Sequence, residues 1–594
     1  MTRRILTAAA LTTCFGLTCT RPEATGRASD RADARLAALF EDYWESRLRE
    51  SPARATYLGD HRYDDRLEDY SPEARAAYLA RRRNYLEVLR TIDRTAVGDP
   101  QRLNAEVFFR VLLDDLDAAE LPDDLMPVRQ QDGPHITLAM LRISQPMASA
   151  DECRRYAARL AAFPAQVDQI IERMREGIDR GLVLPRIIVQ KALPQVESQV
   201  VADARSSELY RVFADRHAAT DDPVRVAVDD DMADAARAAI EGYARLRDFV
   251  RDQYMPACRD TVGLCHLPGG AAMYVRAARL HTTTALAPQE IHEIGLREVE
   301  RIGGEMRAIM SEVGFEGTLA EFCNHLRSRA DLHARSGEEL MRRHREILRR
   351  SDALLPKLFG RLPRTPYELK EIESFRAPAA PVAYYYPAPE TGSRPAYFYV
   401  NTYEPTKRPL YTMEALAYHE AMPGHHLQIA LAQENRGLPA FRRHAEFTAF
   451  VEGWGLYSER LGFDLGGYRD PYSRFGRLTF DAWRACRLVV DTGMHALGWT
   501  RAAAIDFMRR HTALAEIDIE NEIDRYIAWP GQALAYKIGE LEIARLRAEA
   551  ERDLGKRFDI RAFHDELLSA GAIPLDLLND RMVAWRRRQS SIRS

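Results

Sequence analysis

Cysteine, lysine and long apolar runs are all scarce in this sequence, and each scarcity excludes a class of protein. Its 594 residues include seven cysteines, and no two of them form a C-x-x-C pair, which excludes a thiolate zinc knuckle. Almost all of the positive charge is arginine, and the formal net charge of −4 argues against binding to nucleic acid. Beyond the N-terminus, no apolar run reaches the roughly 20 residues of a membrane-spanning helix. The remaining composition, 46% hydrophobic and 29% charged, is typical of a globular protein.

Residues 1–19 predict a signal peptide. Arg3 and Arg4 give a short basic start, an apolar run of small and aliphatic residues follows, and a polar stretch begins around Cys19. These are the three parts of a secretory signal. Cys19 also offers a position for a lipid anchor, although Thr18 is a poor residue to precede a lipid-modified cysteine. We therefore expect an exported protein, either free in the periplasm or anchored to the outer membrane as a lipoprotein.

The rest of the chain is patterned mainly as helices. Apolar residues at helical spacing begin near Ala34. Pro288, with an acidic residue in the following turn, marks the start of a long amphipathic helix that reaches Glu312. Two aromatic, β-prone runs within 382–403 are separated by a loop with proline and glycine, and they predict a hairpin. The predicted regions are a flexible leader at 20–33, an N-terminal helical region at 34–270, and a second helical region at 271–594 that contains the hairpin.

Two cysteines lie close together in the sequence. Cys258 and Cys265 flank a short turn, and an exported protein can hold a disulfide there. Two small, buried, unlinked thiols would fit the same positions. The sequence leaves both possibilities open.

Three histidines and a glutamate are concentrated in one short segment, His419-Glu420-Ala421-Met422-Pro423-Gly424-His425-His426. A hydrolytic zinc site needs three protein ligands and a free position for water, together with a carboxylate that takes a proton from that water. In the usual helical motif, H-E-x-x-H, the two histidines lie on one helix face and the glutamate faces the water. His419 and Glu420 match the first half of this motif, and they predict Glu420 as the general base.

The second half of the motif is expanded, because the fourth residue after His419 is Pro423. On a straight helix His425 would lie about 120° from the face of His419, and His426 would be in phase but about 10 Å further along the axis. Pro423 cannot make the helical hydrogen bond, and Gly424 permits unusual backbone angles. A bulge that absorbs two extra residues would return His425 to the metal, with His426 as the alternative ligand. A helix that simply ends here, with ordinary histidines around a turn, is the alternative without a metal.

Glu452 is the predicted third ligand. It lies in an apolar helical segment, where a carboxylate without a partner is costly, so a bound metal would account for it. Gly453 and Gly455 would let a neighbouring helix approach closely. Glu446 and Glu459 are alternatives, but nearby arginines favour surface positions for both.

The segment from Tyr418 to Gln428 resembles the signature of a bacterial family, the domain of unknown function 885. Members of that family are mostly exported or lipid-anchored bacterial proteins of this length. The resemblance covers most of the chain and includes further motifs at Leu267-Pro268-Gly269-Gly270, Glu290-Ile291-His292-Glu293-Ile294-Gly295, Phe450-Val451-Glu452-Gly453-Trp454, Arg487 to His495, and Arg525-Tyr526 through Pro530-Gly531-Gln532.

The layout is also similar to that of helical gluzincin metallopeptidases, such as angiotensin-converting enzyme, thimet oligopeptidase and the bacterial thermostable carboxypeptidases, which carry H-E-x-G-H. Matching the Gly-His pair implies His419, His425 and Glu452 as the zinc ligands. It also implies a mainly α fold, a large multi-helix body with a deep cleft and a small β-hairpin near the metal site.

The same resemblance implies further roles. Arg525-Tyr526 is similar to an Arg-Tyr pair in the converting enzyme, whose tyrosine stabilises the oxyanion; Tyr536 is the alternative. Either tyrosine could instead be a core aromatic residue with its hydroxyl satisfied inside the protein. The strand Ala396 to Asn401 would pair with an extended peptide substrate, or would be an ordinary sheet edge.

Together, the motif and the resemblance predict a zinc-dependent peptidase that hydrolyses oligopeptides. One alternative is a zinc hydrolase of another amide or an ester, and another is an exported metal-binding protein without catalytic activity. The sequence does not determine cleavage preference, exo- or endopeptidase action, or oligomeric state. It does not determine the native metal either, because manganese or cobalt could use the same ligands.

Overall fold

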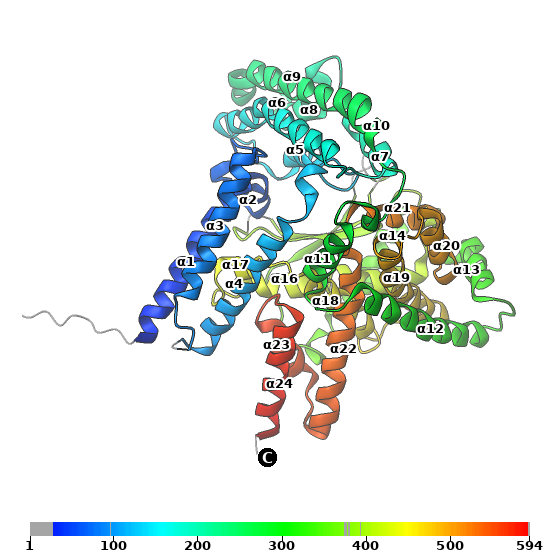
Figure 1. Cartoon of the computed structure of the whole chain (residues 1–594). Helices are drawn as coiled ribbons and strands as arrows, with labels where there is room; N and C mark the ends of the chain where they lie inside the picture. The colour runs from blue at the N-terminus through cyan, green and yellow to red at the C-terminus, as the bar shows by residue number, and fades with distance from the viewer. Residues whose placement is uncertain (1–27, 96, 373–376, 378–379, 393, 592–594) are drawn as a thin grey trace, which may run out of the picture.

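The computed structural model describes residues 28–591, except 96, 373–376, 378–379 and 393, and these residues are mainly helical (Figure 1). The predicted mainly α fold with a small β element is confirmed. The predicted signal peptide at 1–19, with Cys19, lies outside the described residues. Helix α1 (Ala28–Glu50) begins inside the segment that was predicted as a leader at 20–33.

The N-terminal region is built from paired helices. Helices α6 and α9 pack along each other at the top of Figure 1, and α3 and α4 form a second pair beside α1. A capping box between Ser149 and Glu152 fixes the start of α6, because each side chain bonds to the other's backbone N–H. The helices after α1 are α2 (Pro52–Leu58), α3 (Pro72–Arg90), α4 (Asp99–Ala118), α5 (Pro134–Ser144), α6 (Ala150–Asp179), α7 (Arg186–Glu197), α8 (Glu208–Arg216), α9 (Pro223–Phe249) and α10 (Met255–Ala257).

The second helical region contains the predicted long helix and the segments that carry the metal motif. Helix α12 has the predicted bounds, Pro288–Glu312. The other helices are α11 (Gly270–Thr282), α13 (Leu319–Ser328), α14 (Gly337–Asp352), α15 (Met413–Glu420), α16 (His425–Glu434), α17 (Ala440–Arg443), α18 (Thr448–Leu461), α19 (Pro471–His495), α20 (Arg501–His511), α21 (Glu516–Ala528), α22 (Ala535–Leu554), α23 (Ile560–Ser569) and α24 (Leu575–Ser591).

The predicted hairpin is part of a three-stranded sheet. Strands β2 (Ala383–Tyr386) and β3 (Ala396–Val400) pair antiparallel, as expected, and β1 (Tyr367–Glu371) pairs parallel with β3. The order β1-β3-β2 puts β3 in the centre, with both of its edges already hydrogen-bonded. The prediction that Ala396 to Asn401 offers a free edge to a peptide is therefore wrong, because it did not foresee β1.

Close helix packing next to the motif depends on glycine. Helices α18 and α22 cross where Gly453 meets Gly539. A Cβ atom on Gly453 would lie 2.5 Å from the carbonyl carbon of Gly539, and one on Gly539 would lie 1.8 Å from the carbonyl oxygen of Ala449. Neither position can hold a side chain at this separation, so the predicted close approach is present and α22 is its partner.

Cys258 and Cys265 are both free thiols. Cys258 is buried, and the Sγ of Cys265 lies 3.7 Å from the carbonyl oxygen of Met494. Of the two possibilities that the sequence left open, the structure has the unlinked thiols.

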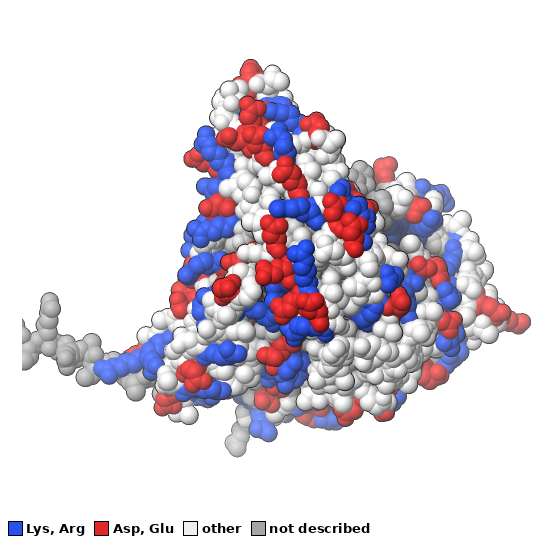
Figure 2. Space-filling model, turned by 45° about the horizontal axis from the view of Figure 1, so that its top comes forward, with Lys and Arg blue, Asp and Glu red and all other residues white. Residues whose placement is uncertain are grey.

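Charges of both signs are interspersed over the face shown in Figure 2, without a broad patch of one sign. Within the described part of the chain, no helix has both the length and the apolar character that a membrane crossing requires.

Candidate metal centre

The expanded His-Glu motif forms two helices joined by a tight turn. Helix α15 ends at Glu420, and α16 begins at His425. The turn brings Gly424 against the preceding helix, where a Cβ atom would lie 1.9 Å from the carbonyl oxygen of His419. The interruption was predicted as a bulge within one helix, but the structure has a complete break. The result is the predicted one, since the rings of His419 and His425 are 4.7 Å apart.

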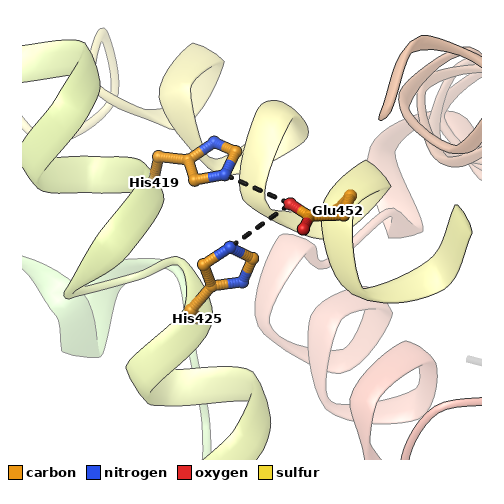
Figure 3. Close-up of side chains that lie close together, drawn as sticks. All are labelled: His419, His425 and Glu452. Carbon is orange, nitrogen blue, oxygen red and sulfur yellow. Dashed lines mark ion pairs between the residues drawn. The ribbon is translucent and has the colours of Figure 1, made fainter. Parts of the chain in front are cut away.

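Glu452, on α18, faces both histidines (Figure 3). Its Oε2 atom lies 3.5 Å from Nε2 of His419 and 3.4 Å from Nε2 of His425. One ligand atom from each of the three residues falls within 4.8 Å of the others. Atoms bound to one tetrahedral zinc at about 2.0–2.2 Å are separated by roughly 3.3–3.5 Å. The spacing therefore fits three ligands of a small divalent ion.

Two of the three side chains also leave a polar atom without a hydrogen-bond partner in the described part of the chain. Oε2 of Glu452 and Nδ1 of His425 are buried and make no hydrogen bond to the described residues. Burial alone would raise the pKa of Glu452, but the two imidazoles hold it well below its ordinary range. Burial lowers the pKa of His419, yet Glu452 and Glu459 outweigh it and raise this pKa to about 9. The cluster thus favours a positive charge at its centre, which a metal cation would supply.

The outer nitrogen of His419 is fixed by a second carboxylate that the sequence reading placed on the surface. Nδ1 of His419 donates to Oε1 of Glu459 at 2.9 Å, and Glu459 is only 1% exposed. Arg484 lies 3.5 Å from the same oxygen. A carboxylate that accepts from the far side of a ligating histidine orients the ring and makes it a better ligand. Glu459 was misplaced because the interpretation considered its neighbours in sequence. Its signal was its position two helical turns after Glu452, on the same face of α18.

The other carboxylate alternative, Glu446, is a surface charge, as expected. Its side chain is 70% exposed and pairs with Arg54 at 3.1 Å. Gly455, between the two buried carboxylates of α18, makes room for the imidazole, because a Cβ atom there would lie 2.8 Å from Nε2 of His419.

His426 lies away from the cluster, although it is the immediate neighbour of His425. Its Nδ1 accepts from the hydroxyl of Tyr385 at 3.1 Å, and its Nε2 donates to the carbonyl of Thr365 at 3.1 Å. Burial lowers the pKa of His426 to about 4. With both ring nitrogens occupied, His426 connects α16 to the sheet, and the geometry favours His425 as the ligand.

The two candidate tyrosines have different environments. The hydroxyl of Tyr526 accepts from Arg487 at 2.7 Å and from Trp483 at 2.9 Å, and it donates to Glu522 at 2.7 Å. Its proton is therefore already committed inside the protein. Tyr536 stacks on His419, with ring centroids 6.3 Å apart.

The hydroxyl of Tyr536 accepts from Arg525 at 3.1 Å, which leaves its own proton free to be donated. Of the two tyrosines, the geometry thus favours Tyr536 as a donor near the metal ligands. Glu420, the predicted base, is the half-buried last residue of α15, and its negative charge helps to raise the pKa of His419.

These features define a helical protein with a carboxylate–histidine cluster suited to a divalent metal. The chain matches the family "Bacterial protein of unknown function (DUF885)" over residues 52–582, and it belongs to that family. No curated protein matches it.

Solved structures resemble most of the chain. A candidate lipoprotein from Colwellia psychrerythraea has a TM-score of 0.89 at 29% identity, over 94% of this chain and 99% of that one. A candidate lipoprotein of unknown function from Shewanella oneidensis has a TM-score of 0.69 at 17% identity, over 92% of this chain and 99% of that one, and shows the fold alone.

Proposed function

We propose that this protein is a zinc-dependent peptidase with His419, His425 and Glu452 as its metal ligands. The observation that carries the proposal is the buried Oε2 of Glu452, which has no hydrogen-bond partner and lies 3.4 and 3.5 Å from the two imidazoles. Two histidines and a glutamate are a donor set of catalytic zinc sites, which keep a further position for water. The fold adds an oriented outer carboxylate, Glu459, as such sites have.

The surrounding residues then have distinct roles. When bound, zinc supplies a water of lowered pKa and polarises the carbonyl of the substrate. Glu420, next to His419, accepts the proton of the attacking water and passes it to the leaving amine. The hydroxyl of Tyr536 donates a hydrogen bond to the developing oxyanion and stabilises its negative charge. Glu459 holds the His419 ring in the tautomer that presents Nε2.

Metal analysis of the mature protein, beside the variants His419→Ala and Glu420→Gln, tests the proposal. We expect nearly one zinc per chain in the unaltered protein and in Glu420→Gln, and none in His419→Ala. A peptide library should be cleaved by the unaltered protein only, because Glu420→Gln keeps the ligands and loses the base. Absence of zinc after reconstitution, or full activity in Glu420→Gln, would overturn the assignment.

We also propose that the protein is exported and carries a lipid anchor at Cys19. The N-terminal sequence supports this proposal, and both similar structures are described as candidate lipoproteins. Mass spectrometry of the membrane fraction should find a lipid-modified N-terminal cysteine, and Cys19→Ala should move the protein to the soluble periplasmic fraction. An unmodified mature N-terminus would overturn the lipid anchor, and the protein would then be exported as a free periplasmic protein.

A further inference from the structure

The side chains beside the candidate metal centre form a wall of the site. One arginine in this wall has a guanidinium nitrogen without a hydrogen-bond partner in the described part of the chain. Arg487, on α19, is 1% exposed. Its Nε donates to the hydroxyl of Tyr526 at 2.7 Å, and its Nη2 donates to Glu522 at 2.9 Å. Its Nη1 is buried and has no hydrogen-bond partner among the described residues. Buried polar groups are usually paired. Several other described arginines leave Nε unpaired, whereas Arg487 leaves a terminal nitrogen, which is free to take a partner outside the chain.

The charge balance of this wall points to an anionic partner. Arg487 and Arg525 form ion pairs with a single carboxylate, that of Glu522, at 2.9 and 3.5 Å. The Nε of Arg525 is likewise buried without a partner. Burial would raise the pKa of Glu522, but the two arginines keep it below its ordinary value, so this carboxylate is ionised and shared. Two guanidinium groups and one carboxylate leave an excess positive charge.

A nearby cation shows the opposite balance. Lys537, on α22, contacts three carboxylates, those of Asp481, Glu540 and Glu298, at 2.7, 2.9 and 3.1 Å. This part of the fold therefore does supply carboxylates to a buried cation. The shortage of carboxylates is limited to the surroundings of Arg487.

The unused arginine is close to the proposed metal ligands. The guanidinium carbon of Arg487 lies 4.2 Å from the ring centroid of Tyr536, and that ring stacks on His419 at 6.3 Å. Together these two contacts bound the separation between Arg487 and His419 at roughly 10 Å, which about three extended peptide residues cover at roughly 3.5 Å each. The side chains of Arg525 and Glu522 are 18% and 17% exposed, so the wall has a solvent face.

We propose that Arg487 and Arg525, with Tyr536, form a subsite for the C-terminal carboxylate of a peptide cleaved near its C-terminus. The inference rests on the proposed peptidase function and specifies its substrate class. Guanidinium groups suit this role, because their N–H donors match the two oxygens of a carboxylate. The short distance between the subsite and the metal ligands makes the enzyme a peptidase that releases one to three residues from the C-terminus.

The first test needs no variant. The same short peptides are offered to the zinc-loaded protein as free acids and as C-terminal amides. We expect kcat/KM to be about 10- to 100-fold higher for the acids, as for a charge-assisted hydrogen bond, and one to three residues to be released from the C-terminus. Equal rates for acid and amide, or cleavage far from the C-terminus, would overturn the subsite.

The second test replaces the arginine. Arg487→Lys keeps the charge but cannot serve Tyr526, Glu522 and a ligand together. We expect the acid-to-amide ratio of kcat/KM to fall toward one, chiefly through a higher KM for the acid peptides. Arg159→Lys is the matched control, because Arg159 is 0% exposed and each of its guanidinium nitrogens has a hydrogen-bond partner. The control should keep the preference for acids, and loss of the preference in both variants would indicate a general packing effect and overturn the subsite.

A failure of the subsite can be distinguished from a failure of the proposed function. Zinc binding with equal hydrolysis of acids and amides removes the subsite and leaves the peptidase. If no zinc or no hydrolysis is found, calorimetric titration of the protein with the same acid and amide peptides still tests the subsite. Binding of the acid alone supports an anion site without peptidase activity, and equal or absent binding of both removes it.

Discussion

Two regions of the molecule bury arginine in different ways. In the N-terminal region Arg159 is 0% exposed, and each of its three guanidinium nitrogens has a partner: the carbonyl of Arg66, the amide oxygen of Gln145, and the carbonyls of Pro52 and Tyr63. Arg487, in the second region, is as deeply buried but leaves Nη1 unpaired. A buried charged group with all of its hydrogen bonds made stabilises one structure. A buried charged group that lacks a hydrogen-bond partner and lies beside a cluster of titratable groups is typical of functional sites.

The largest effect is expected where the same contrast occurs between two adjacent histidines. His426 has partners on both nitrogens, whereas His425 has an unpaired Nδ1 and faces Glu452. His425→Ala should lose bound zinc and all peptidase activity, because it removes a ligand. His426→Ala should retain zinc and lose only stability. Metal content by atomic absorption checks both variants, and zinc loss in His426→Ala alone would reverse the assignment.

The next effect compares the two arginines directly. Arg159→Met should lower the free energy of unfolding by about 3–5 kcal/mol, because it leaves several buried acceptors unpaired. Arg487→Met should cost less, about 1–3 kcal/mol, because Arg525 still pairs with Glu522. Urea denaturation of the zinc-loaded variants measures both losses. Equal losses would mean that Arg487 is an ordinary structural arginine.

A third, smaller effect concerns the orientation of a ligand. Glu459→Gln should weaken zinc binding about 10- to 100-fold and leave the fold intact, because an amide is a poorer acceptor for the Nδ1–H of His419. Competition with a chromogenic chelator measures the affinity. Glu446→Gln is the control, since that side chain is largely exposed and far less constrained. An unchanged zinc affinity in Glu459→Gln would mean that Glu459 contributes to packing but does not orient the ligand.

The smallest effect is a change in the pH dependence of stability. Asp491 accepts from the hydroxyl of Tyr274 at 2.6 Å and from the N–H of Gly531, and burial raises its pKa to about 7 despite these bonds. Its contribution to stability is therefore complete below about pH 4 and is lost as the pH rises through about 7.

Asp491→Asn keeps an acceptor and removes this titration. Its Tm should vary less between pH 5 and 8 than that of the unaltered protein, by an amount on the order of a few degrees. Parallel profiles for the two proteins would contradict the titration of Asp491 in this range.

Local patterns in the sequence were sufficient for some of these features. The bounds of Pro288–Glu312 follow from a proline at the first helical position and an acidic residue that caps it. Glu452 could be selected because an isolated carboxylate in an apolar segment needs a partner. The complete break between α15 and α16 could not be distinguished from a bulge, since proline and glycine are compatible with both.

The rest depends on tertiary contacts that no local pattern contains. The Arg487 wall is assembled from α19, α21 and α22, which meet only in the folded chain. The central position of β3 depends on its pairing with β1, a strand of five residues whose short apolar–polar alternation was too brief to identify from the sequence alone. Tyr536 replaced Tyr526 as the better donor because hydrogen-bond partners, rather than sequence neighbours, decide which hydroxyl is free.

The contact between Gly453 and Gly539 limits how this site can diversify. Glu452 precedes one glycine and Glu540 follows the other, and at neither glycine is there space for a Cβ atom. Any substitution there would separate α18 from α22 and so move Glu452 away from Tyr536. Relatives that keep this helix contact would therefore have to keep both glycines, however their substrate preferences differ.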